Sequence, residues 1–237
     1  TRISILFQDH DPPKINGICK PRKPTGSADS GADLAYALQE LNIDIVTPKC
    51  SPKIDNDRDW VFSDTIDVIN QAIQPPHNAN TIFLNTVLYK GHPIEYFFHH
   101  HHPNLTIVGQ IPETVGVWDD KLVANHTLEQ HGLPIPKSNT IKQSEMELLF
   151  QDNGHNAAKN SPLYEFTFPF VLKPIRGRGS QGVSLIYNYK ELYTKLHNMF
   201  DEKVYGNAVY IEQFLPGKEI TITVMPKGKY IFPKKSP

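Results

Sequence analysis

The sequence predicts an α/β chain with a parallel sheet in its first part and an antiparallel α+β unit in its second. Two observations predict this division. In the first part, short apolar runs alternate with segments of helical periodicity, which is the order that builds parallel sheets. In the second part, a glycine-rich loop joins two apolar runs with no helix between them, which is typical of antiparallel strands. We place the boundary after Val117.

The first apolar run, at residues 3–7, predicts a buried strand. A polar stretch rich in proline and glycine follows to about residue 30. Leucines then recur at 34, 38 and 41, which indicates a helix that ends before Asn42. Residues 43–46 read as a second strand. This strand–loop–helix–strand opening favours a Rossmann-like parallel sheet over residues 1–117.

The same alternation continues toward the boundary. Asp64 is expected to cap a helix that carries Ile66, Ile69 and Ile73 on one face. Two further strands are predicted at 81–84 and 105–108, each bounded by Asn, Gly or Pro.

The second part begins with a helix, which Asp119 or Asp120 can cap and which ends at Gly132. Another helix is predicted over residues 144–151. Strands are expected at 168–173 and 183–187, on either side of the glycine loop.

The remaining elements complete an α+β unit. Asn188 is expected to cap a helix with Leu192, Leu196 and Met199 along one side. Residues 208–214 and 219–225 then read as two strands around a Pro-Gly turn. We interpret 118–207 as a lid and 208–237 as the start of a second, central sheet whose remainder is missing.

Composition narrows the class of protein. Of the 237 residues, 39% are hydrophobic and 21% are charged, as in ordinary globular proteins. The net charge of -1 provides no overall positive potential that would attract nucleic acid. The two cysteines indicate a reducing compartment, and no apolar run approaches the roughly 20 residues that span a bilayer. We therefore expect a cytoplasmic protein without a nucleic-acid or membrane partner.

The glycine-rich loop GRGSQG at 177–182 is the strongest candidate for a ligand-binding motif, and it has several interpretations. A dinucleotide fingerprint requires a helix directly after the glycines, but VSLIY follows, which favours a strand. A protein-kinase glycine loop places its lysine on the following strand, whereas Lys173 precedes this loop. A solvent-exposed hairpin turn without a ligand also fits the loop taken alone.

The fourth interpretation is a flap whose backbone N–H groups surround the β- and γ-phosphates of a nucleotide. Glycines allow such a close approach and positive φ angles. Lys173 would lie at the end of the strand beneath, and Arg176 and Arg178 would add positive charge.

Other segments support the flap and together resemble a known family. They are FPFVLKP at 168–174, YIEQFLPGKE at 210–219, and Asp120-Lys121 with GLPIP at 132–136. With the glycine loop, this pattern resembles the ATP-grasp superfamily, and within it the D-alanine–D-alanine ligase-like carboxylate–amine ligases. The resemblance covers most of residues 118–233, while the first third is similar only in the order of its elements.

The resemblance implies a role for each matching residue. Lys121 and Lys173 would contact the ATP phosphates from two sides, and Glu219 would hold the ribose hydroxyls. Glu212 would accept a hydrogen bond from the adenine amino group, and the backbone would complete the contact to the base. The residues of the flap and of that backbone contact would be Gly177, Gly179, Ser180, Gln181, Gly182, Gln213 and Leu215. Arg176 and Ser180 are the candidate catalytic residues.

The sequence also departs from the family pattern. The Asp, Glu and Asn that hold two Mg²⁺ ions in the family do not occur before Pro237, so we expect a truncated chain. Residues 25–30 loosely match the loop that holds the first amino acid, with Asp29 where glutamate is expected, and Gly179 replaces the flap serine. D-Alanine is therefore not assigned as the substrate.

The expected function is an ATP- and Mg²⁺-dependent ligase that joins a small-molecule carboxylate to an amine through an acyl phosphate, in a protein that could be a homodimer. A nucleotide-binding module without turnover and an ATP-grasp kinase remain alternatives. The run of histidines at 99–102 indicates an exposed loop better than a metal site, because four adjacent imidazoles cannot all face one ion.

Overall fold

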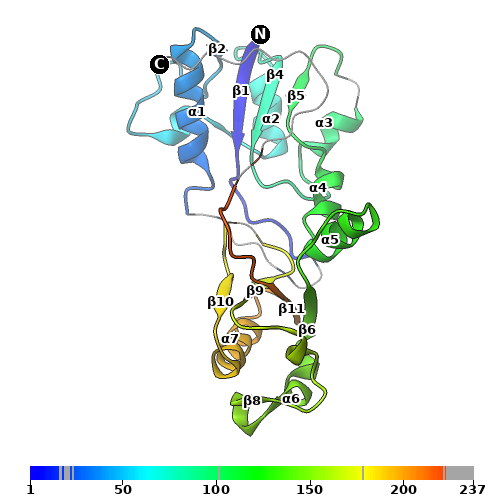
Figure 1. The fold of residues 1–237 in the computed structure, drawn as a ribbon. Helices are drawn as coiled ribbons and strands as arrows, with labels where there is room; N and C mark the ends of the chain where they lie inside the picture. The colour runs from blue at the N-terminus through cyan, green and yellow to red at the C-terminus, as the bar shows by residue number, and fades with distance from the viewer. Residues whose placement is uncertain are drawn as a thin grey trace.

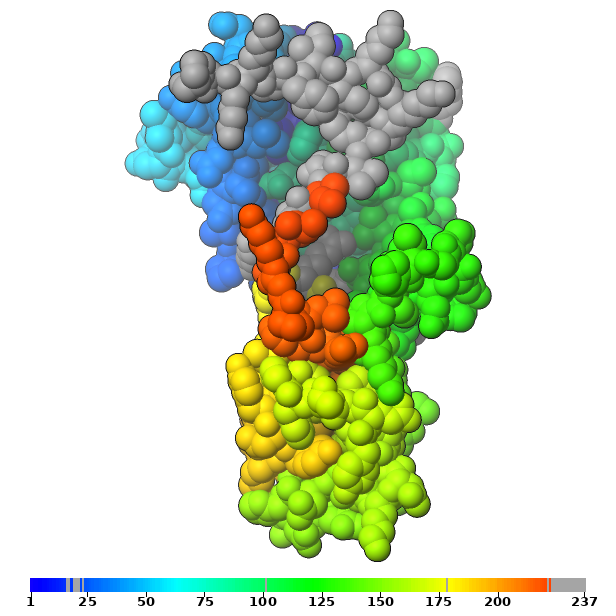
Figure 2. Space-filling model, viewed as in Figure 1, coloured from blue at the N-terminus to red at the C-terminus, as the bar shows by residue number. Residues whose placement is uncertain are grey.

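The computed structural model describes residues 1–15, 18, 22, 24–100, 102–177, 179–220 and 222. A parallel sheet and an antiparallel sheet lie at opposite ends of an elongated molecule, with helices α4 (Pro112–Trp118) and α5 (Lys121–Gln130) between them (Figure 1). The predicted boundary at Val117 falls within the last turn of α4. Figure 2 shows the two lobes and residues 214–220, which run from the antiparallel lobe toward the parallel one.

The parallel sheet has the strand order β2-β1-β4-β5, and β3 also pairs with β1. Its strands are β1 (Arg2–Phe7), β2 (Asp44–Ile45), β3 (Phe62–Ser63), β4 (Thr81–Asn85) and β5 (Thr106–Val108). Every pairing in this sheet is parallel, as predicted. The two-residue strand β3 was not predicted, because so short a run has no periodicity of its own.

The helices of the first part are α1 (Ala28–Glu40), α2 (Ile66–Ile73) and α3 (Glu95–His99). The helix α1 buries Ala28, Gly31, Ala32 and Ala35. Small residues face the sheet here because the helix lies close to it, so the leucine stripe that predicted the helix is only partly buried. Leu41 is 71% exposed and follows the last helical residue.

The antiparallel sheet has the order β10-β9-β11-β6. Its strands are β6 (Ser138–Lys142), β9 (Phe170–Pro174), β10 (Ser184–Ile186) and β11 (Ala208–Gln213). The strand β6 was missed because its polar residues give no strand pattern, and its place is set by pairing with β11. A small hairpin, β7 (Phe150–Gln151) with β8 (Asn156–Ala157), lies beyond this sheet.

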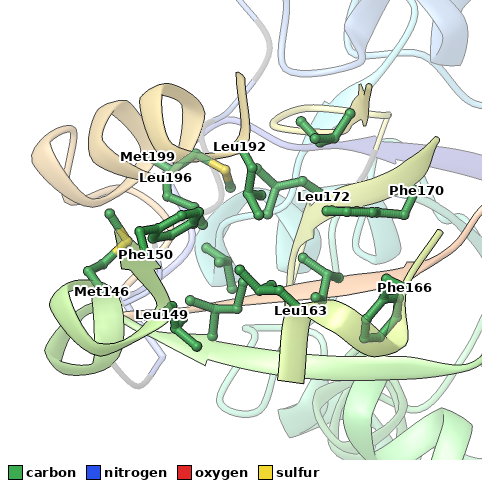
Figure 3. Packing of buried hydrophobic residues seen from close by; sticks show 14 of the residues in the cluster. Met146, Leu149, Phe150, Leu163, Phe166, Phe170, Leu172, Leu192, Leu196 and Met199 are labelled. Carbon is green, nitrogen blue, oxygen red and sulfur yellow. The ribbon is translucent and has the colours of Figure 1, made fainter. Parts of the chain in front are cut away.

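Helix α7 (Tyr189–Asp201) covers one face of the antiparallel sheet. Asn188 caps it by accepting from the Glu191 N–H at 2.9 Å, as predicted. Its apolar side meets the inward side chains of β9 and residues of α6 (Met146–Leu149), as Figure 3 shows. Each fully buried leucine or phenylalanine of this core stabilises the fold by about 1.5–3 kcal/mol.

The predicted helix over 144–151 is shorter than expected. A 3-10 turn at Gln143–Glu145 precedes α6, and residues 150–151 belong to β7. Three more 3-10 turns occur at Asp57–Asp59, Asp152–Gly154 and Pro162–Glu165. The strand predicted over 219–225 lies mostly outside the described residues, and Glu219, Ile220 and Ile222 belong to no strand.

Candidate nucleotide site

The candidate site begins on the face of the antiparallel sheet that is turned away from the hydrophobic core. Along β9 and β11 the side chains alternate, so Leu172 and Ile211 enter the core while Lys173, Tyr210 and Glu212 share the opposite face. Tyr210 lies directly across from Lys173 in the antiparallel register. Glu212 is therefore the diagonal neighbour of Lys173 on this face.

Lys173 and Glu212 form an ion pair through Nζ and Oε1. Their side chains are only 17% and 15% exposed, so the pair is largely removed from water. The Lys173 ammonium also lies 5.4 Å from the centre of the Tyr210 ring, a cation–π contact. The sequence predicted both residues for the site but not their contact, because the contact depends on strand register.

Helix α5 brings Lys121 to the same place. Asp120 caps this helix by accepting from the N–H groups of Leu122 at 2.9 Å and Val123 at 3.3 Å, as predicted. The Asn125 amide of this helix donates to the Tyr210 hydroxyl at 2.6 Å, which joins α5 to the polar face of the sheet.

The Lys121 side chain reaches the base of the glycine loop. Its Nζ donates to the carbonyls of Ile175 at 3.4 Å and Gly177 at 3.5 Å. Burial lowers the pKa of Lys121, and the positive charge of Lys173 lowers it further, while Glu212 and Asp120 act in the opposite direction. Two lysines thus lie close enough to repel each other, which favours a site for an anion.

The glycine loop connects β9 to β10 as a hairpin, and Leu172 pairs with Ser184 at its stem. The tip residues Gly179, Ser180 and Gln181 are exposed. Gly179 and Ser180 have φ angles of 61° and 58°, so successive residues at the tip adopt the left-handed conformation. Gly182 also has a positive φ, and a Cβ there would lie 2.8 Å from the Tyr205 ring.

Arg176 lies at the stem of this loop and not at its tip. It is buried, its Nη1 donates to the Gly116 carbonyl at 2.9 Å, and its Nη2 lies 3.3 Å from Asp120. Its charge is matched within the protein, so Arg176 ties the stem to the junction of α4 and α5. This placement does not favour the predicted catalytic role, and Arg178 lies outside the described residues.

The residues expected to contact the nucleoside lie at and beyond the end of β11. The Gln213 N–H donates to the Lys137 carbonyl at 2.8 Å, so a contact from Gln213 to a base would have to use another of its groups. Leu215 is 62% exposed, and Glu219 is exposed as well. The described structure does not bring Glu219 into contact with Glu212.

A second polar cluster, which the sequence interpretation missed, lies at the carboxyl ends of β1, β3 and β4. Asp64 is not a helix cap, because Thr65 occupies that position and the Asp64 carboxylate is buried. It accepts from the Asp9 N–H at 3.1 Å, the Thr86 hydroxyl at 2.5 Å and His92 Nε2 at 3.1 Å. The Ile94 N–H donates to His92 Nδ1, which places the His92 proton on Nε2.

The electrostatics of this cluster favour an ionised Asp64. Burial alone would raise the pKa of Asp64, but the hydrogen bonds from His92, Thr86 and the Asp9 N–H outweigh it and lower the pKa. His10 Nδ1 lies 3.1 Å from Asp64 Oδ1, and its Nε2 lies 2.7 Å from the Tyr89 hydroxyl. The three short strand ends that meet here are not visible as neighbours in the sequence.

Comparison with known proteins gives a family match over part of the chain. Residues 127–234 match the family described as the D-ala D-ala ligase C-terminus. D-alanine–D-alanine ligase A of Bacillus cereus is 31% identical over 106 residues, which is 45% of this chain and 31% of that protein. Phosphoribosylamine–glycine ligase of Fusobacterium nucleatum is 26% identical over 133 residues, 55% of this chain and 28% of that protein. The chain thus spans about a third of the length of these curated relatives.

Solved structures share the fold over nearly the whole chain. VanG D-Ala:D-Ser ligase from Enterococcus faecalis has a TM-score of 0.56 and 16% identity, covering 91% of this chain and 63% of that one. D-alanine–D-alanine ligase from Bacillus anthracis complexed with ATP has a TM-score of 0.51 and 17% identity, covering 91% of this chain and 59% of that one. The first third, whose sequence is similar only in element order, therefore has the fold of these proteins as well.

Proposed function

We propose that this chain is an ATP-grasp protein of the D-alanine–D-alanine ligase-like kind, and that it binds ATP and ligates a carboxylate to an amine. The family match over residues 127–234 and the fold shared with D-alanine–D-alanine ligase support this proposal. Two lysines, Glu212 and the stem of a glycine hairpin gather on one polar face, and this observation carries the proposal. The related Bacillus anthracis structure is described as complexed with ATP, which supports ATP as the nucleotide.

Each part of the site suits a part of ATP. The like charges of Lys121 and Lys173 would be neutralised by the phosphates, which the Gly179–Ser180 tip would cover with backbone N–H groups. Glu212 would accept from the adenine amino group once Lys173 turns to the phosphates.

The proposed reaction has two steps. A substrate carboxylate oxygen attacks the γ-phosphorus and ADP leaves, which gives an acyl phosphate. An amine nitrogen then attacks the acyl carbon, the C–O bond to phosphate breaks, and an amide and inorganic phosphate form. The protein accelerates the first step mainly by positioning and by neutralising charge.

Magnesium would supply positive charge to neutralise the phosphates of ATP in such a reaction. Among the described residues, the group of three His or acidic side chains close enough to share one ion lies on α3 and α4, not beside Lys173. The described residues beside Lys173 therefore include no group of three such ligands that could hold magnesium. We place the acid and the amine at the carboxyl edge of the parallel sheet, where open α/β sheets bind ligands.

The test is ADP release by the purified protein with a panel of amino and hydroxy acids and amines. ADP and phosphate that form only when an acid and an amine are both present would support the ligase. A stable phosphorylated hydroxyl product without any amine would identify a kinase. ATP binding with no ADP under any substrate would identify a non-catalytic module.

A further inference from the structure

We propose a divalent transition-metal site formed by Glu95, His99 and Glu113, on the parallel-sheet lobe and separate from the nucleotide site. One potential ligand atom from each of these side chains lies within 4.8 Å of the other two. The set comprises two carboxylates and one imidazole, which suits zinc and similar ions better than magnesium or calcium.

The backbone explains how three side chains separated in sequence meet. Glu95 and His99 lie at positions i and i+4 of α3, so they face the same side of that helix. Glu113 comes from the first turn of α4, which begins after β5. A bound ion would therefore join α3 to the start of α4.

The charge balance of the cluster favours a cation. Within the described part of the chain, neither Glu95 nor Glu113 forms an ion pair with a lysine or arginine. One oxygen of Glu95, Oε1, is buried and has no hydrogen-bond donor, while Oε2 accepts from the Gly91 N–H at 2.5 Å. A carboxylate oxygen removed from water without a donor is stabilised by a cation or a proton, so this atom of the partly buried Glu95 suits a bound ion.

The same backbone contact would support a bound ion. The Gly91 N–H holds the Glu95 carboxylate in one orientation, as partners of metal ligands commonly do. A surface pocket of about 500 Å³, lined in part by Glu95, His99 and Glu113, gives an ion access from solvent.

Two other described histidines of the run, His100 and His102, make contacts elsewhere, whereas His99 faces the two glutamates. His100 stacks on Tyr96 at 3.9 Å between ring centres and lies 2.8 Å from the Tyr96 carbonyl through Nδ1. His102 packs against Phe97, with ring centres 5.3 Å apart. His101 lies outside the described residues, and among the described histidines of the run His99 lies beside two glutamates.

Ligand bonds of about 2.0–2.2 Å require the donor atoms of a tetrahedral site to lie about 3.3 Å apart. The present spacing of up to 4.8 Å is larger, so the side chains must rotate toward the ion. His99 and Glu113 are both exposed and free to do so.

The proposal is tested with Zn²⁺ alone on the purified, chelator-treated protein, by titration calorimetry and thermal unfolding without nucleotide. We expect one Zn²⁺ per chain and a rise in Tm that EDTA reverses. Glu113→Gln and His99→Gln should each weaken zinc binding at least about tenfold. His100→Gln, the matched control in the same run, should bind zinc as the parent does.

Two results would overturn the proposal. One is the absence of a stoichiometric zinc site in the folded parent protein. The other is loss of zinc in His100→Gln together with unchanged binding in Glu113→Gln, which would assign the ion to the histidine run. None of these variants changes Lys121 or Lys173, so failure of the zinc proposal leaves the ATP proposal unaffected.

Discussion

The Lys173–Glu212 ion pair offers the sharpest test of the candidate nucleotide site. Replacing Lys173 with Met keeps the aliphatic bulk but leaves Glu212 with no cation in an environment where its side chain is 15% exposed. Removing one partner of a fully buried pair costs about 3–5 kcal/mol, so partial exposure predicts a loss of about 2–3 kcal/mol here. Domains are typically stable by about 5–15 kcal/mol, so the variant should still fold.

Replacing Glu212 with Gln should lower the free energy of unfolding less than replacing Lys173 with Met. In Glu212→Gln the Lys173 ammonium keeps its contact with the Tyr210 ring, which is worth about 0.5–2 kcal/mol. The double variant should lose less stability than the sum of the two single losses, by about 1 kcal/mol or more. Urea unfolding of the four proteins measures this coupling energy.

Measurements of nucleotide binding distinguish the proposed role of Lys173 at the phosphates from that of Glu212 at the adenine. Lys173→Met should weaken ATP at least about tenfold, or 1.4 kcal/mol, while leaving adenosine binding within about threefold of the parent. Glu212→Gln should weaken adenosine and ATP alike. Unchanged ATP affinity in folded Lys173→Met protein, or a coupling energy of zero, would refute the assignment of this face to the nucleotide.

Four other substitutions give distinct changes in stability. Gly182→Ala should destabilise the fold by about 2–3 kcal/mol in thermal or urea unfolding, because its Cβ would lie too close to the Tyr205 ring and the residue has a positive φ. Gly179→Ala, which has open space around its Cβ, should cost only about 1 kcal/mol. Equal losses of stability in the two variants would contradict the predicted clash with Tyr205. Arg176→Met should lose about 2–4 kcal/mol of unfolding free energy, and full stability would show that the stem does not need its guanidinium. Asp64→Asn should be less stable than the parent at neutral pH. Because the folded pKa of Asp64 is lowered, its contribution is complete above the unfolded value of about 3.8 and is lost as pH falls through the lower folded pKa, so the two unfolding curves should converge there.

Local signals in the sequence predicted most of the elements. Periodicity and end signals located α2, α5 and α7, and Asp120 and Asn188 cap their helices as expected. The strand β6 could not be found in this way, since only pairing with β11 makes its polar residues a strand. Asp64 was misread because a carboxylate before a helix looks like a cap, whereas its partners Thr86 and His92 lie 22 and 28 residues later in the chain.

In the candidate site, too, local sequence signals predicted some features, while features that depend on distant contacts were missed. Lys121, Lys173 and Glu212 were chosen by motif, and α5, β9 and β11 carry them to one face. Arg176 was assigned to the phosphates because it precedes the glycines. Its partners, Gly116 and Asp120, lie more than 50 residues earlier, so nothing local revealed that it belongs to the stem.

The anchoring of Arg176 determines which part of the hairpin can move. Because Arg176 fixes the stem to α4 and α5, we expect motion of the hairpin to be confined to the exposed residues around Gly179. Ordering so short a stretch over a ligand costs less conformational entropy than ordering a whole lobe. On the proposed function, a nucleotide would need to order only these exposed tip residues when it binds.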